Sequence, residues 1–597
     1  GMGRCQKLRL LSVCTIAETD GRIRMISRGG TVSIIVARVI LVGKVFAFSN
    51  NEAPQDYGPV VILEHAAARG DLFYTLYGHL STDTLKGLYA GKPIACGERF
   101  GRIGAADVNG GWTPHLHFQI ITDLLDLGCD FPGMVRSGER SLWTLFSPDP
   151  NLVIGIPQDR FPAPDPSASD TLAARRKYIG RNLSIGYRKP IKMVRGWRQY
   201  LFDDTGRRYL DAYNNVPHVG HCHPRVVKAV SRQMSVLNTN TRYLHDFINR
   251  YAERLCDTLP APLSVCFFVN SASEGNELAL RLARAFTGQR DMIVLEAAYH
   301  GHTTSLIDIS PYKHNGPGGK GAPSWVHTAP IPDLYRGLYR SDDPQAALKY
   351  AGHVDDIIRK LLVKGMGLAG FIAETCPSVA GQIFLPAGYL PEVYRQVHRA
   401  GGLCIADEVQ TGYGRIGTHF YAFEAENLVP DIVVLGKPIG NGHPISAVIT
   451  TPEIAEAFDN GMEFFSTFGG NAVSCAAGLT VLEVVIEENL QAKALKAGKR
   501  MLAKMIPFID RFSIVGDVRG SGLFLGVELV RDRETLEPAK EEAEFIVNRM
   551  REAGILLGTD GPFENVIKIR PPMPFDESNA EFLAANLERI LKEDFMI

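Results

Sequence analysis

Short, fully apolar runs alternate with longer helix-like segments in the chain beyond about residue 265. The runs have the length and β-branched content of buried strands, and the segments between them repeat apolar residues at helical spacing. This alternation predicts an α/β fold with a mainly parallel sheet and crossover helices. Ligands of such sheets bind at the carboxyl ends of the strands, so the residues directly after each run are the first site candidates. The runs are Val265–Val269, Met292–Leu295, Phe371–Ala373, Leu403–Ala406 and Ile432–Leu435.

The distribution of residue types along the chain divides it into modules. Residues 1–146 alternate apolar and polar positions with frequent Gly and Pro, which predicts a β-rich domain. Residues 147–174 are dense in Pro, Asp and Ser and predict an interdomain linker. Residues 175–597 form the second domain, with a large part at about 220–489 and a smaller α/β part at about 490–597 that ends in helix and strand patterns.

Composition and charge favour a small molecule as the partner. Of the 597 residues, 45% are hydrophobic, which is enough to bury more than one core. Lys and Arg number 64 and Asp and Glu 65, so the formal net charge of -1 gives no reason to expect nucleic acid or a membrane surface.

The cysteines and the apolar segments near the start indicate the compartment. Ten cysteines without a C-x-x-C pair argue against a disulfide framework or a zinc knuckle and indicate the reducing cytoplasm. The most apolar run, Ser33–Phe48, contains Arg38 and Lys44 and is too short to span a membrane, so it predicts a strand. Residues Lys7–Ala17 imitate a signal peptide, but polar residues interrupt the apolar part, and secretion is not expected.

A small-residue segment follows the first apolar run and begins a helix. Ser271 and Glu274 have the spacing of a capping box, and Ala272 and Ser273 lie between them. A helix N-terminus preceded by small residues offers free backbone N–H groups to a phosphate. An ordinary capped helix is the alternative, and this motif alone favours it. The segment has neither the P-loop nor the G-x-G-x-x-G pattern, which argues against those nucleotide sites.

Three further strand ends carry chemically distinctive residues. Tyr299 and His300 follow the second run, and Tyr299 has the ring to stack on a flat cofactor. Asp407 ends a buried strand and must find a cation or donors there, and the protonated nitrogen of a pyridine ring is such a cation. Lys437 also ends a buried strand, where an imine to an aldehyde cofactor would explain its amine. Alternatively, Asp407 could cap a helix or form a structural ion pair, and Lys437 could extend its amine to solvent. The occurrence of the small-residue helix start, the aromatic residue, the aspartate and the lysine in this order along the chain predicts pyridoxal 5'-phosphate (PLP) instead.

Residues from about Asp170 to the end resemble the class III (ω-) aminotransferase family of fold-type I PLP enzymes, a mainly parallel sheet domain with a small α/β domain. The matching segments are ADEVQTGYGRIG, GKPIGNGHP, NSASEGNELALRLARA, AYHGH, STFGGN and FIAET. The resemblance implies that Lys437 forms the Schiff base and Asp407 pairs with the pyridinium. It also implies a homodimer with a shared site, because Thr467 would reach the cofactor phosphate of the neighbouring subunit.

The same resemblance implies the remaining cofactor contacts. Val409 would lie against the ring, Gln410 would approach its phenolic oxygen and Tyr299 would stack. Ala272 stands where the family usually has glycine in the phosphate turn. The full expected cofactor set is Ser271, Ala272, Ser273, Tyr299, His300, Glu374, Asp407, Val409, Gln410, Lys437 and Thr467.

Within the family, several segments look most like the ethanolamine-phosphate and phosphohydroxylysine phospho-lyases, among them YLDAYNNVPHVGHCHPRVVKAV and GPFENVIKIRPPMPF. Lys568 stands where amino-acid aminotransferases usually have a carboxylate-binding arginine. In a strand Lys568 and Arg570 share a face, so both could meet one phosphate; the alternative is that they point to solvent.

A primary amine substrate would displace Lys437 in an external aldimine, and Lys437 would then remove a proton from the amine-bearing carbon. Phosphate on the adjacent carbon would leave by β-elimination, and otherwise transamination to a 2-oxo acid would follow. The sequence leaves both open and favours the phospho-lyase.

The first module resembles the LytM-type (M23) zinc peptidases through YGHL at His79 and HLH at His115 and His117. The resemblance implies His117 as a zinc ligand and His79 with His115 as a polarising pair. The family also needs an upstream H-x-x-x-D, yet no histidine precedes His65. Catalytic zinc needs three protein ligands, so we expect a degenerate, inactive module without zinc. A zinc hydrolase and a binding scaffold with both sites dead remain the rival classes.

Overall fold

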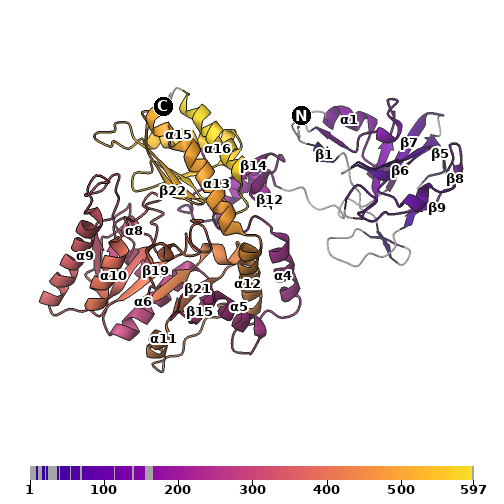
Figure 1. The fold of residues 1–597 in the computed structure, drawn as a ribbon. Helices are drawn as coiled ribbons and strands as arrows, with labels where there is room; N and C mark the ends of the chain where they lie inside the picture. The colour runs from indigo at the N-terminus through magenta and orange to yellow at the C-terminus, as the bar shows by residue number, and fades with distance from the viewer. Residues whose placement is uncertain are drawn as a thin grey trace. The chain divides into compact units, whose positions relative to one another are not determined.

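The chain forms two compact units, Gly1–Ser167 and Ala168–Ile597 (Figure 1). The structure is a computed structural model that describes residues 8–10, 17–19, 22–24, 36–38, 41–53, 56–67, 70–112, 114–136, 140–154 and 166–593. Helix α2 (Asn151–Ile154) lies in the expected linker, residues 147–174, and helix α3 (Ala168–Tyr178) begins in it; residues 155–165 are outside the described part.

The first unit is built on an antiparallel five-stranded sheet of order β10-β7-β6-β5-β8. Alternate residues of the central strand β6 enter different hydrophobic clusters: Val61 and Leu63 pack in one, Val60 and Ile62 in the other. The sheet is therefore buried on both faces, as period-two alternation requires. The strands are β5 Gly43–Asn51, β6 Gly58–Ala66, β7 Leu72–Gly78, β8 Pro93–Ile94 and β10 His117–Ile121.

Short elements complete this unit. The prediction of one strand over Ser33–Phe48 was wrong, because β4 (Val36–Arg38) pairs with β9 while β5 belongs to the larger sheet; residues 33–35 and 39–40 lie outside the described part. Residues Lys7–Ala17 lie mostly outside it as well. The remaining elements are β1 Leu8–Leu10, β2 Ala17–Thr19, β3 Arg22–Arg24, β9 Arg99–Arg102, β11 Met134–Arg136 and α1 Arg140–Phe146.

A seven-stranded sheet of order β15-β21-β20-β19-β18-β16-β17 forms the centre of the second unit. Strands β20, β19, β18, β16 and β17 are parallel, so the predicted α/β class with a mainly parallel sheet is confirmed. All five predicted runs are strands in it. The bounds are β15 Val265–Val269, β16 Asp291–Leu295, β17 Val326–Ala329, β18 Leu368–Glu374, β19 Leu403–Asp407, β20 Ile432–Leu435 and β21 Ser446–Thr450.

Strand β21 is a departure from the predicted pattern. It pairs antiparallel with both β15 and β20, so β15 has no parallel neighbour among the described strands. Because β21 is antiparallel to both neighbours, β15 and β20 run in the same direction. Val269, at the end of β15, lies opposite Ser446, and Leu435, at the end of β20, lies opposite Ala447. The carboxyl ends of β15 and β20 therefore still meet at one edge of the sheet.

Helices cover both faces of this sheet (Figure 1). On one face α6 packs with Ile372 and Ile405, and on the other α9 and α10 pack with Phe371 and Cys404, because neighbouring residues of a strand point to opposite faces. Helix α12 packs against α4 and α5. The helices are α4 Pro224–Met234, α5 Asp246–Cys256, α6 Ala272–Thr287, α7 Thr304–Asp308, α8 Pro311–His314, α9 Ala346–Val363, α10 Tyr389–Arg399, α11 Pro452–Phe458 and α12 Ala472–Glu487.

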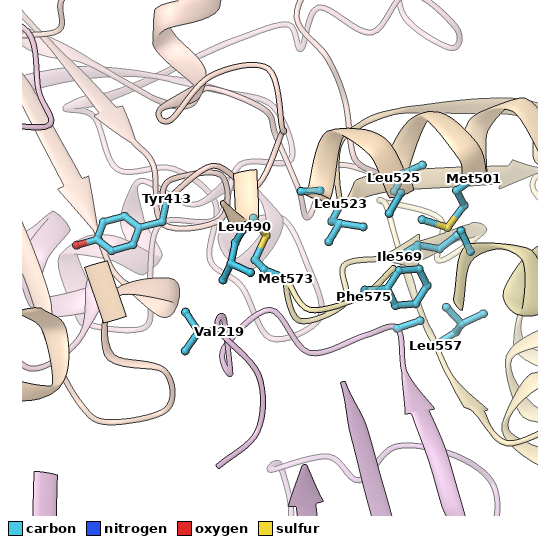
Figure 2. Packing of buried hydrophobic residues seen from close by; sticks show 14 of the residues in the cluster. Val219, Tyr413, Leu490, Met501, Leu523, Leu525, Leu557, Ile569, Met573 and Phe575 are labelled. Atoms are coloured by element: carbon cyan, nitrogen blue, oxygen red, sulfur yellow. The ribbon is translucent and has the colours of Figure 1, made fainter. Parts of the chain in front are cut away.

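The C-terminal part adds the antiparallel sheet β22-β23-β26-β25. Its residues Leu523, Leu525 and Ile569 pack with Met501 and Phe575 in one buried core (Figure 2). The elements are α13 Leu490–Met505, α14 Phe508–Arg511, β22 Val515–Ser521, β23 Phe524–Leu529, α15 Lys540–Glu552, β25 Gly558–Asp560, β26 Val566–Ile569 and α16 Glu577–Leu591.

Residues before 220 complete this smaller part. Strand β14 pairs in parallel with β24 (Ile555–Leu556), so the start of the unit joins its end in a further sheet, β12-β13-β14-β24. The expected small part, residues 490–597 alone, was therefore incomplete. The added strands are β12 Met193–Trp197, β13 Tyr200–Asp203 and β14 Arg208–Asp211.

Arg415 ties the two parts of this unit together. Its side chain is fully buried, and Nη1 donates to the carbonyl oxygens of Leu523 (3.4 Å) and Pro571. Nη2 donates to His218 Nδ1 at 3.1 Å, and His218 Nε2 donates to the carbonyl oxygen of Tyr413 at 2.9 Å. One guanidinium thus links the loop after β19 to the backbone of both strands at one end of the antiparallel β23–β26 pair.

Among the described residues, none of the helices has both the length and the apolar content needed to cross a bilayer.

Candidate active site

A cavity of about 340 Å³ lies at the carboxyl ends of β15, β16, β18, β19 and β20, within the usual size range for small-ligand sites. It brings together all but one of the residues expected to contact the cofactor, the exception being Thr467. The expected residues that line it are Ser271, Ala272, Ser273, Tyr299, His300, Glu374, Asp407, Val409, Gln410 and Lys437.

The N-terminus of α6 forms one wall of the cavity. Ser271 is its N-cap, and Ser271 Oγ accepts a hydrogen bond from Glu274 N at 3.3 Å. The predicted capping box is incomplete, because the Glu274 carboxylate accepts from Asn270 N (3.2 Å) rather than from the N-cap. Ser273 Oγ bonds to His302 Nδ1 at 2.9 Å, a contact that the sequence did not predict. The helix start can still hold a phosphate, since Ser271, Ala272 and Ser273 line the cavity at the positive end of the helix dipole.

Ala272 replaces the family's usual glycine at this wall. A Cβ built on Gly436 would lie 2.8 Å from the Ala272 methyl group. Glycine at 436 therefore makes room for alanine at 272, directly before Lys437.

Asp407 is buried and held by three donors. Oδ2 accepts from Asn276 Nδ2 (2.9 Å) and from His300 Nδ1 (2.8 Å), and Oδ1 accepts from Val409 N (3.2 Å). Asn276 Nδ2 also donates to the carbonyl oxygen of His300 at 2.8 Å. His300 therefore supports the carboxylate, and Asn276 is a site residue that sequence reasoning missed. The available signal was a polar residue on the buried face of α6.

Lys437 begins a 3-10 turn, Lys437–Gly440, directly after β20. Burial, followed by the charge of Arg570, lowers the pKa of its amine, and Asp407 and Glu374 partly oppose this. Within the described part of the chain Lys437 makes no ion pair or hydrogen bond. A half-buried amine of lowered pKa without a hydrogen-bond partner fits an imine to an aldehyde, so the lysine suits PLP.

Glu374 lies at the end of β18, and its register partner is Asp407. Burial raises the pKa of Glu374, and the charge of Asp407 raises it further. Glu374 Oε2 accepts from Ser378 N at 3.2 Å, whereas Oε1 is buried without a partner. An unsatisfied buried oxygen beside the cavity is available to a ligand.

Gln410 connects the cavity to the strand that carries Lys568 and Arg570. Gln410 Oε1 accepts from Asn215 Nδ2 (2.6 Å) and from Arg570 Nη1 (2.5 Å). Arg570 Nη1 also donates to Ser378 Oγ at 2.9 Å. With its oxygen occupied, the Gln410 amide can offer only N–H donors to a ligand.

The two candidate substrate cations are buried, which excludes the solvent-facing alternative. Lys568 is 7% exposed and Arg570 6%. Lys568 Nζ forms an ion pair with Asp560 Oδ2 at 2.7 Å, and Asp560 was not predicted. Neither cation lines the 340 Å³ cavity directly, although Arg570 contacts Gln410, which does.

Thr467 is exposed and does not line the 340 Å³ cavity. It precedes Phe468, which is 68% exposed, and follows Phe465, which is 41% exposed.

In the first unit three imidazoles cluster. The rings of His79 and His115 lie 4.4 Å apart, and those of His79 and His117 5.9 Å. Burial lowers the pKa of His117 to about 3 and that of His79 to about 4, and His117 Nε2 is buried without a partner.

Among the described residues, His79, His115 and His117 do not form a group of three whose ligand atoms all lie within 4.8 Å of one another. Within the described part of the chain, the one group of three ligating residues whose atoms lie within 4.8 Å of one another is His398, Cys404 and Asp431, in the other unit. Asp431 already accepts from His398 (2.8 Å) and Cys404 N (2.7 Å). Burial raises the pKa of the Cys404 thiol, which disfavours the thiolate that a metal needs.

Comparison with known proteins finds a family model that matches part of each unit. Residues 185–591 match the family model described as aminotransferase class-III, and residues 35–126 match peptidase family M23. An alanine–glyoxylate aminotransferase 2-like protein of Drosophila melanogaster is 51% identical over 70% of this chain and 86% of its own length. An ethanolamine-phosphate phospho-lyase homolog of Caenorhabditis elegans is 40% identical over 71% and 94%.

Among solved structures, a phospholyase from Arthrobacter in complex with phosphoethanolamine is 40% identical, with a TM-score of 0.68, covering 71% of this chain and 99% of that one. A Bacillus anthracis aminotransferase is 26% identical, with a TM-score of 0.66, covering 71% and 98%. The first unit resembles M23 peptidases over residues 35–126. The chain belongs to the class III aminotransferase family, and it is an enzyme that uses pyridoxal 5'-phosphate.

Proposed function

We propose that the second unit is a phospho-lyase that eliminates phosphate from a phosphoethanolamine-like primary amine. The observation that carries this proposal is the pair of buried cations, Lys568 and Arg570, beside the cavity: Arg570 Nη1 donates to Gln410, which lines the cavity, and the charge of Arg570 lowers the pKa of the Lys437 and Lys568 amines. Buried cations need an anion, and a phosphate supplies several acceptor oxygens. The names of the relatives from Caenorhabditis elegans and Arthrobacter support the same substrate class.

Lys437 and Asp407 have different roles in the proposed reaction. Lys437 removes the proton from the amine-bearing carbon, since it lines the cavity and burial lowers the pKa of its amine, which favours the basic form. Asp407, fixed by Asn276 and His300, keeps a proton on the pyridine nitrogen. When bound, PLP supplies an electron sink for the charge left on that carbon.

The cavity walls would hold the cofactor in place. The start of α6, with Ser271, Ala272 and Ser273, would bind its phosphate, and Tyr299 and Val409 would enclose the ring. Gln410 would donate to the phenolic oxygen, and Glu374 would accept a proton or hydrogen bond through its unpartnered Oε1.

A transaminase that moves the amino group to a 2-oxo acid is the second candidate. The identity of 51% to an alanine–glyoxylate aminotransferase 2-like protein favours it. Both reactions begin with the same proton removal by Lys437, so only the fate of the substrate separates them.

The decisive assay supplies phosphoethanolamine without a 2-oxo acid. A phospho-lyase is expected to release inorganic phosphate and ammonia in equal amounts over many turnovers, measured with a phosphate dye and an ammonia-coupled assay. Release of no phosphate, together with amino transfer that requires pyruvate or glyoxylate, would instead establish the transaminase.

We also propose a homodimer in which Thr467 contacts the cofactor phosphate of the neighbouring subunit. Support comes from the exposed position of Thr467 beside Phe465 and Phe468, together with exposed Met462 (71%). Large exposed apolar side chains in one segment are typical of a protein interface.

Mixing two defective variants tests this arrangement. Thr467→Ala is expected to weaken PLP binding, and Lys437→Ala to abolish activity. A mixed dimer would hold one intact site, with Lys437 from one subunit and Thr467 from the other. At limiting PLP, random pairing of the co-refolded subunits is therefore expected to restore up to about a quarter of wild-type activity. Failure of any mixture to exceed the Thr467→Ala variant alone, at limiting PLP, would contradict a shared site.

We further propose that residues 1–146 and 175–597 act as separate domains in a reducing compartment such as the cytoplasm. The division of the chain at Ser167 and the family matches over 35–126 and 185–591 support the first point. The six cysteines of residues 166–593 form no disulfide, which supports the second.

A further inference from the structure

Lys568 and Asp560 form an ion pair on one face of the C-terminal sheet. They lie on the adjacent antiparallel strands β26 and β25, and their side chains are each 9% exposed. Asp560 Oδ2 also accepts from Gln382 Nε2 at 3.3 Å. Lys568 Nζ lies 5.1 Å from the centre of the Tyr213 ring.

The sheet around Lys568 leaves space for this arrangement. On both neighbouring strands the residue opposite Lys568 is glycine: Gly526 on β23 and Gly558 on β25. A Cβ on Gly558 would lie 2.3 Å from the Tyr213 ring, and one on Gly526 would lie 3.1 Å from Gln382 Cβ. The glycines admit Tyr213, whose ring lies beside the lysine amine, and Gln382, which donates to Asp560.

The charges around Lys568 keep its proton available near neutral pH. Burial, followed by the charge of Arg570, lowers its pKa to about 8, and Asp560 opposes this. A buried ammonium of this pKa can both carry and release a proton. The titratable and charged groups that face Lys568 or its partner from the surrounding elements are Asp560, Arg570, Lys437, Glu374 and Tyr213.

We propose that Lys568 donates the proton that the departing phosphate takes, and that Asp560 is the positioning residue that keeps Lys568 aimed and protonated. This rests on the proposed phospho-lyase function. When the bond between the substrate's carbon and the phosphate oxygen breaks, its electron pair stays on that oxygen, and the proton of Lys568 Nζ moves to it. The products are hydrogen phosphate and neutral Lys568, which regains a proton from water. Arg570, which stays charged, holds the phosphate.

A change of leaving group tests the proton transfer. Sulfate is a much weaker base than phosphate and leaves without a proton, so ethanolamine O-sulfate bypasses the step. Lys568→Arg keeps the positive charge but cannot donate readily. We expect kcat for phosphoethanolamine to fall by about 10²- to 10⁴-fold, the usual range for a general acid, and kcat for the sulfate ester by less than about tenfold. Equal losses with both substrates, in a variant with the wild-type spectrum of bound PLP, would overturn the proposal.

The second measurement does not depend on turnover. The rate at which acetic anhydride labels Lys568, followed against pH by peptide mass spectrometry, reports the pKa of this amine in the full chain. In Asp560→Asn the pKa of Lys568 is expected to fall, because the opposing carboxylate is lost while burial and Arg570 remain. The alkaline limb of the pH profile for phosphate release should move to lower pH with it.

Glu564→Gln is the matched control. Glu564 forms an exposed ion pair with Lys540 at 2.5 Å, and its loss should leave the labelling of Lys568 unchanged. An unchanged pKa of Lys568 in Asp560→Asn would overturn the role of Asp560. A wild-type enzyme that releases no phosphate would overturn the proposed function and this inference together, whereas release that Lys568→Arg leaves intact would overturn the inference alone.

Discussion

Replacing Lys437 with alanine is expected to abolish covalent binding of the cofactor and to lower kcat by about 10⁴-fold or more, for phosphate release and for amino transfer alike. The reason is that Lys437 is the one lysine among the described residues that line the 340 Å³ cavity. Both the imine and the base for proton removal are lost with it. The visible absorption of the imine between Lys437 and the cofactor, measured on purified protein, checks the loss of covalent binding. Steady-state rates check the fall in kcat.

Lys360→Ala serves as the control, because Lys360 is exposed in the last turn of α9, away from the cavity. It should bind PLP and turn over like wild type. Borohydride reduction of the wild-type protein followed by peptide mass spectrometry should place the cofactor on Lys437. Attachment at another lysine, or unaltered turnover in Lys437→Ala, would refute the assignment.

Replacing Asp407 with asparagine is expected to reduce kcat by about 10³-fold, the loss typical of removing one preorganised electrostatic group. The carboxylate accepts from Asn276, His300 and the backbone of Val409, and an amide cannot accept all three bonds because one side of it donates. A buried donor left facing another donor also costs about 1–3 kcal/mol of stability. Steady-state kinetics and a melting curve separate the two effects.

Asp431→Asn is the matched control for this substitution. Asp431 likewise accepts from a histidine, His398, and from a backbone N–H group, that of Cys404, but at the opposite end of β19. It should lower the melting temperature while leaving kcat within about twofold, as expected for a structural hydrogen bond away from the reaction. Equal kinetic losses in Asp407→Asn and Asp431→Asn would show that the Asp407 effect is only structural.

The sequence could predict where the site lies, because parallel strands bring their carboxyl ends to one edge whatever their order. This rule placed Asp407 and Lys437 at a common cavity before the order of β19 and β20 was known. It failed to find β21, since the segment SAVIT is as short and apolar as its neighbours and its direction depends on the loop that precedes it. Predictions of strand direction need pairing partners, which a single run does not contain.

The sequence pattern could not predict contacts between residues that are far apart in the chain. Asn276 and His302 contact Asp407 and Ser273 from distant segments, and nothing in their local sequence names the other residue. Asp560 lies in the three-residue strand β25, which is too short to show periodicity. These residues can be recognised as part of the site only from the three-dimensional arrangement of the strands.

The buried guanidinium of Arg415 has a consequence for how the enzyme selects its substrate. Sliding or rotating the C-terminal part away from the main sheet would strip a desolvated cation of the carbonyls of Leu523 and Pro571, which costs several kcal/mol. The loop after β19, which follows Asp407, and the backbone next to β26, which carries Lys568, are thus held together before any ligand binds. Discrimination among amines must then come from a preset shape and charge pattern rather than from closure around the substrate.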